Sequence, residues 1–99
     1  MKLKFKIIGF NHLIPSIGKE GLGLELPGQQ SAHLQDVIER LFHVCNQEIR
    51  TILFVDGMNI NPFFQIVIGK DHWILAKNLN DAIIKDGDLI KFIVLPAGG

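Results

Sequence analysis

The residues with the clearest chemical potential are Gly98 and Gly99, which follow a strongly apolar run at residues 89–95 and a single Pro96-Ala97 step. Glycine has no Cβ, so two glycines in succession make a thin peptide with nearly unrestricted backbone angles. Such an end can enter a narrow site on a partner and present its carboxyl group there. We therefore expect residues 96–99 to form a flexible tail that becomes ordered when a partner holds it. A frayed end that happens to finish in glycine is the simpler alternative.

Length and composition indicate one globular domain that spans residues 1–99. A chain of this size has no room for a second core. With 47% apolar and 20% charged residues, it lies within the range of ordinary folded domains. Ten basic residues balance ten acidic ones, and this neutrality argues against nucleic acid or an anionic membrane as the partner.

Cysteine use and the N-terminal pattern favour a cytoplasmic protein. Cys45 is the only cysteine, which excludes an internal disulfide and any four-cysteine metal cluster. Residues 1–8 alternate lysine with large apolar side chains and lack the continuous apolar stretch of a signal peptide. No segment has the length needed to cross a bilayer. The four histidines are too scattered to predict a metal site, so we expect the chain itself to bind neither metal nor cofactor.

The elements that position the tail can be predicted from hydrophobic periodicity. Residues 2–10 and 22–26 alternate with a period of two, which predicts two strands joined as a hairpin. Ser31 is expected to cap a helix whose apolar residues recur at intervals of three and four up to Cys45. On the opposite helical face, Asp36 and Arg40 have the spacing of an ion pair.

The second half of the chain predicts further strands. Residues 51–55 are rich in β-branched and large apolar side chains and precede an Asp-Gly turn, with residues 58–60 as a return strand. Residues 63–68 fit a short strand better than a helix, and residues 89–95 have the apolar character of a central strand. One helix on one face of a mixed sheet is an α+β fold, and pairing the last strand beside the first gives the ubiquitin-like β-grasp topology.

Three local features join this order of elements: Phe54-Val55-Asp56-Gly57 after the helix, Lys85-Asp86-Gly87-Asp88-Leu89-Ile90 before the last strand, and Pro96-Ala97-Gly98-Gly99 at the end. Together they resemble the MoaD/ThiS family of sulfur carrier proteins, and the resemblance covers essentially the whole chain. The family includes the small subunit of molybdopterin synthase, the thiamine-pathway sulfur carrier and relatives in cysteine biosynthesis. The resemblance leaves open which of these pathways applies here.

The resemblance implies an ATP-dependent cycle at the Gly99 carboxylate. A ubiquitin-activating-type adenylyltransferase, using ATP and Mg²⁺, would adenylate Gly99; a sulfide or persulfide donor would convert it to a thiocarboxylate, and a synthase subunit would accept the sulfur. Gly98 would provide clearance in the partner's channel. No G-x-x-x-x-G-K-[ST] loop is present, so we expect ATP to bind the partner and this chain to act as a carrier, not an enzyme.

Strand parity predicts a docking patch beside the tail. If Leu3 and its alternate neighbours pack under the helix, the remaining residues of the first and last strands form an exposed face, rimmed by Lys4 and Lys6. The predicted partner-binding residues are Ile8, Phe10, Lys91, Ile93, Leu95, Pro96 and Ala97. The alternative is that residues 61–80, or a second copy of the chain, cover this face.

Two other functions share these features. A ubiquitin-like modifier would transfer activated Gly99 to lysines of other proteins, and a noncovalent β-grasp binding module would need no tail chemistry. Cys45 could be imagined as a sulfur carrier, but it lies on the apolar stripe of the predicted helix, which favours a buried, inert thiol.

Overall fold

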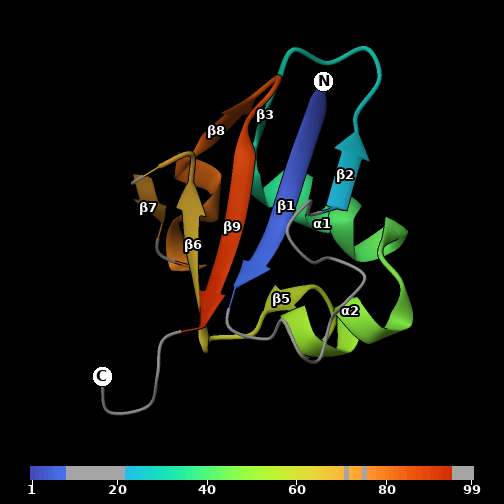
Figure 1. Ribbon diagram of the computed structural model, residues 1–99, viewed down its shortest axis with the longest axis vertical. Helices are drawn as coiled ribbons and strands as arrows, with labels where there is room; N and C mark the ends of the chain where they lie inside the picture. The colour runs from blue at the N-terminus through green and yellow to red at the C-terminus, as the bar shows by residue number, and fades with distance from the viewer. Residues whose placement is uncertain (9–21, 71, 75, 95–99) are drawn as a thin grey trace.

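The computed structural model describes residues 1–8, 22–70, 72–74 and 76–94. Five of the described strands form one mixed sheet in the order β2-β1-β9-β6-β7, which Figure 1 shows face-on. Its strands are β1 (Lys2–Ile8), β2 (Leu22–Glu25), β6 (Phe64–Ile68), β7 (His72–Ile74) and β9 (Leu89–Val94). The short strand predicted at residues 63–68 is confirmed as β6.

The last strand is central, as predicted. β9 runs parallel to β1 and antiparallel to β6, while β2 pairs antiparallel with β1 as the expected hairpin partner. Continuous apolar character suits this position, because a strand with neighbours on both edges has all its backbone groups paired within the sheet. The described part of the first strand ends at Ile8, and the prediction that it reaches Phe10 lies outside the described residues.

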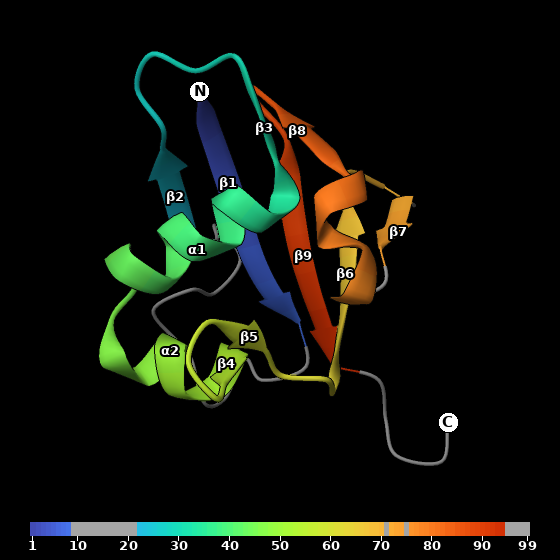
Figure 2. The same ribbon diagram turned by 180° about the vertical axis from the view of Figure 1, so that it is seen from behind.

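Helix α1 (Leu34–Val44) covers one face of the sheet, as Figure 2 shows from behind. The predicted apolar stripe is confirmed, since Leu34, Val37, Ile38 and Leu41 are fully buried. This stripe packs against the inner face of the sheet, and the pair forms the main hydrophobic core.

Two details of this helix differ from the prediction. Ser31 is not its cap: it belongs to β3 (Ser31–His33), which pairs with β8 (Ile83–Lys85), and the helix begins at Leu34, whose N–H donates to the Ala82 carbonyl over 2.8 Å. Backbone pairing thus replaces the side-chain cap. Asp36 and Arg40 have the spacing of an ion pair but do not form one, and the one ion pair among the described residues joins Lys2 to Glu25.

A second helix replaces part of the strand predicted at residues 51–55. This helix, α2 (Gln47–Leu53), is capped by Asn46, whose side-chain oxygen accepts a 2.8 Å hydrogen bond from the Ile49 N–H. Only β4 (Phe54–Val55) remains extended, and it pairs with β5 (Asn59–Ile60) around the expected Asp-Gly turn. Asp56 and Gly57 both have positive φ, at 49° and 85°, which explains the residue types found there.

The described strands within residues 61–80 extend the sheet and do not lie over its exposed face. β6 and β7 add two strands beyond β9, and the 3-10 helix η1 (Ala76–Asp81) then leads into β8. Among the described residues, no helix has the length and apolar character needed to cross a membrane.

Candidate partner-binding face and tail root

Strand β9, which precedes the tail, is anchored by aromatic packing on its core side. Phe92, in the middle of β9, is fully buried; it stacks on Phe5 with ring centroids 5.9 Å apart and meets Phe64 edge-on at 6.3 Å. Hydrogen-bonded neighbours on both edges, β1 and β6, fix the same strand laterally. The strand that precedes the tail is therefore anchored in the hydrophobic core.

The opposite side of these strands, which we call the outer face, carries the predicted docking residues that the structure describes. Ile8 lies directly opposite Ile93, and Lys6 lies opposite Lys91 one step further from the tail. Ile8 is 39% exposed, and Ile93 and Lys91 are half-buried. The structure thus brings Ile8, Lys91 and Ile93 together on one face, at the end of the sheet from which residues 95–99 continue.

The other residues predicted to bind the partner or to react lie outside the described part of the chain. These are Phe10 near the end of the first strand, Leu95, Pro96 and Ala97 in the tail, and the two terminal glycines, Gly98 and Gly99. The described register places Val94, the last residue of β9, opposite Phe64, so the chain continues into the tail beside the start of β6.

Sequence reasoning missed the contribution of β6 and β7 to this face. Val67 lies between Lys91 and Trp73 in the sheet and is 1% exposed, although it is not part of the core beneath α1. Trp73 on the edge strand β7 is 55% exposed, and Phe63, just before β6, is 77% exposed. A period of two, with Gln65 and Val67 on one side of the strand and Phe64, Ile66 and Ile68 on the core side, could have predicted this face once β6 was placed.

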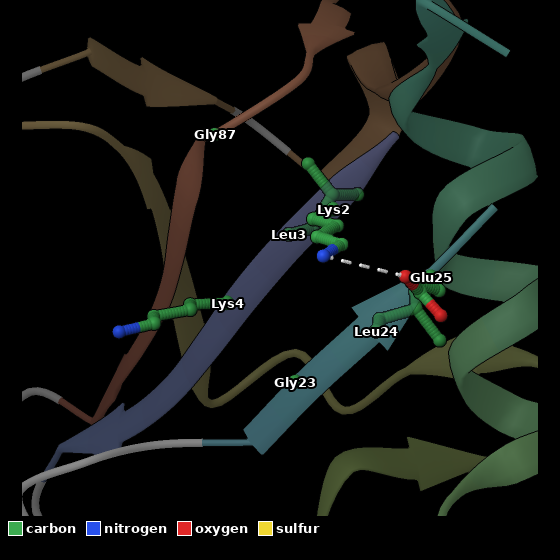
Figure 3. A pocket seen from close by; sticks show the side chains of 7 residues that line it. All are labelled: Lys2, Leu3, Lys4, Gly23, Leu24, Glu25 and Gly87. Carbon is green, nitrogen blue, oxygen red and sulfur yellow. Dashed lines mark ion pairs between the residues drawn. The ribbon is translucent and has the colours of Figure 1, made fainter. Parts of the chain in front are cut away.

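At the far end of β1 from the tail, the structure forms an open pocket of about 500 Å³. Figure 3 shows its lining: the Lys2 amine reaches to within 3.9 Å of the Glu25 carboxylate, while Lys4 points away from that pair. Gly23 leaves space there, since a Cβ built on it meets no atom within 4 Å. Both members of the Lys2–Glu25 pair are largely exposed, so the pair adds little to stability.

Cys45 is buried, as the apolar stripe indicated. Its side chain is 6% exposed, and Sγ lies 3.8 Å from the Phe42 carbonyl oxygen. Burial raises the pKa of the thiol, and the neighbouring Arg50 opposes this only in part. Arg50 itself caps the end of α1, with Nε donating to the Phe42 carbonyl over 3.0 Å. A protonated, buried thiol is poorly suited to sulfur transfer.

The mixed sheet, its order and the helix on one face define an α+β protein with the ubiquitin-like β-grasp fold, which confirms the predicted class. SAMP1 from Haloferax volcanii matches with a TM-score of 0.70 and 14% identity over 100% of both chains. The Haloferax volcanii HVO 2177 protein matches at 0.61 and 18% identity, covering 100% of this chain and 87% of its own. Urm1 from Trypanosoma brucei matches at 0.62 and 22% identity, covering 99% of this chain and 95% of its own.

At these identities the likeness shows the fold, which is the β-grasp that the resemblance to the MoaD/ThiS family implies. No protein-family model matches the chain, and no curated protein matches it in sequence.

Proposed function

We propose that the chain is a ubiquitin-like sulfur carrier whose Gly99 carboxylate is activated by a partner enzyme. The observation that carries the proposal is the position of β9: it is the central strand, paired on both edges and packed on Phe5 and Phe64, and it continues into Gly98-Gly99. A partner can bind a rigid domain of this kind while the extension delivers the terminal carboxylate into the partner's active site.

The chemistry begins with a poor electrophile. The anionic, resonance-stabilised carboxylate of Gly99 attacks the α-phosphorus of ATP bound to the partner, a P–O bond forms, and pyrophosphate leaves. Sulfide then attacks the acyl carbonyl of the mixed anhydride; a C–S bond forms, the C–O bond to AMP breaks, and a proton is released. With a persulfide donor, a second thiol must afterwards cleave the S–S bond. The product in both cases is a thiocarboxylate at Gly99.

Glycine is required at the last two positions for steric reasons. The partner must surround the reacting carbonyl closely enough to exclude water, and a Cβ at Gly98 or Gly99 would widen the peptide and restrict its backbone. The chain supplies no phosphate loop of its own, which supports a division of labour between a carrier and an activating enzyme. The sulfur would then pass to a synthase subunit of molybdopterin, thiamine or cysteine biosynthesis, in the cytoplasm.

The test is the intact mass of the chain after incubation with the ubiquitin-activating-type enzymes of its source organism, ATP, Mg²⁺ and sulfide. We expect a gain equal to the exchange of one oxygen for sulfur, confined to the last residue in fragmentation spectra. A variant lacking Gly99 should fold equally well and show no gain. Gly99 joined to lysines of other proteins would point instead to a protein modifier. If function is unchanged after removal of Gly98-Gly99, the chain is instead a noncovalent binding module.

A further inference from the structure

Charge is distributed unevenly over this neutral protein. The chain carries zero formal net charge, yet the five strands of the main sheet contain four lysines, at positions 2, 4, 6 and 91, against one glutamate, Glu25. Glu25 already pairs with Lys2. The strands that carry the outer face therefore have a net charge of +3, and the compensating acidic residues lie elsewhere in the chain.

Two of these lysines are placed where their charges repel each other. Lys6 and Lys91 are direct neighbours on adjacent strands and face the same side of the sheet. Neighbouring strands are only about 4.8 Å apart, and like charges at directly opposed positions destabilise a sheet. Both side chains are half-buried, so their stems lie along the sheet surface, and no described acidic residue forms an ion pair with either.

The described acidic residues nearest to Lys91 along the chain have other roles. Asp86 accepts a hydrogen bond from the Lys2 N–H, and Asp88 accepts one from the Lys85 N–H over 2.8 Å, both at the opposite end of β9 from the tail. They shape the turn before β9 and do not face the Lys6–Lys91 pair. Among the described residues, no carboxylate therefore offsets the repulsion within the pair, and a partner could relieve it.

We propose that the outer face docks the acidic surface of the partner that activates the tail, with carboxylates placed on Lys6 and Lys91 and an apolar contact on Ile8 and Ile93. This inference rests on the proposed function. The two pairs follow one another along the same strands, two residues apart. At about 3.3 Å per residue, the partner's carboxylates lie about 7 Å from its apolar contact, on the side away from the tail.

The apolar pair decides the class of partner. Ile8 and Ile93 sit between the lysine pair and the tail, and the phosphate backbone of a nucleic acid offers no apolar surface for an isoleucine pair there. A protein surface with an apolar centre and an acidic rim complements both pairs at once. Rim charges of this kind act mainly on the rate of association and on partner choice.

The experiment measures tail activation as a function of protein concentration and salt, using the double variant Lys6→Glu/Lys91→Glu. We expect its KM for adenylation to rise by about tenfold or more at low ionic strength, with kcat unchanged, and the difference to shrink as salt screens the charges. The matched control, Lys70→Glu/Lys85→Glu, changes the net charge equally at two exposed sites outside the two pairs and should leave KM near the wild-type value.

The outcomes separate this inference from the proposed function. If the wild-type chain is never adenylated, the proposed function fails. If the wild-type chain is adenylated and both double variants have the same KM, the docking inference is wrong while the proposed function stands. Circular dichroism and the melting temperature establish that the variants are folded. Binding to single-stranded RNA or to vesicles of anionic lipid that is lost in Lys6→Glu/Lys91→Glu, with KM unaffected, would also overturn it by assigning the lysine pair to a polyanion.

Discussion

The two faces of the central sheet are built from the same strands but differ in the burial and charge of their side chains. On the inner face, Leu3, Phe5 and Phe92 are at most 3% exposed and belong to the same hydrophobic core as the buried residues of α1. On the outer face, Ile8 is 39% exposed, and Lys6 and Lys91 are neighbours of like charge. The inner face is thus organised for stability, whereas the outer face retains unfavourable features that a free, purely structural domain would gain nothing from.

The largest expected effect comes from changing adjacent residues of β9 that point to opposite faces. Phe92→Ala removes a fully buried ring with two aromatic neighbours and should lower the free energy of unfolding by about 3–5 kcal/mol. Ile93→Ala removes a half-buried side chain and should cost about 1 kcal/mol, while raising the KM for tail activation. Guanidinium unfolding at equal m-values measures the first difference. Equal losses from the two variants would contradict the division between the faces.

The parity of these faces could be predicted from sequence because the pattern is strong. Lysines alternate with large apolar residues through β1, so the period of two is unambiguous, and Lys91 then fixes the orientation of an otherwise apolar β9. The central position of β9 followed from its composition. These are local signals, and the structure agrees with them.

Other parts of the fold depend on contacts that the local sequence does not encode. Ser31 has the chemistry of a helix cap, but its backbone pairs with Lys85, far along the chain, and this pairing moves the helix start to Leu34. Helix α2 is only seven residues long, too short for a clear period, and its β-branched residues Thr51 and Ile52 favour the strand that was predicted. The Asn46 cap was the available signal for it.

The contrast between the faces is sharpened by Val67, a residue of the outer face with the burial of a core residue. It is 1% exposed, and its neighbours across the strands are Lys91 and Trp73. Val67→Ala should lower the free energy of unfolding by about 1–2 kcal/mol, at about 0.8 kcal/mol for each carbon removed. The control Gln65→Ala, on the same strand and face, should stay within about 0.5 kcal/mol of the wild type.

Val67→Ala should also leave the KM for tail activation unchanged, since a covered side chain offers little to a partner. Urea unfolding and the adenylation assay provide the two measurements. A large rise in KM without loss of stability would mean that Val67 is uncovered on docking, and the outer face would then be a surface that rearranges when the partner binds.

The smallest expected effect is a gain, at the edge of the outer face. Gly23 lies in β2 opposite Lys4, and a Cβ built on it meets no atom within 4 Å. Glycine within a strand has a high entropic cost, so Gly23→Val should raise the free energy of unfolding by about 0.5–1 kcal/mol, seen as a melting temperature higher by a few degrees. Atoms added on the packed inner face should instead lower the free energy of unfolding, because a core at native density has no room for them. Leu24→Phe, the next residue and 6% exposed beneath the sheet, should therefore lower the melting temperature. If both substitutions destabilise the protein, the open space at Gly23 is filled in solution, and the two faces are less different at this edge than along β9.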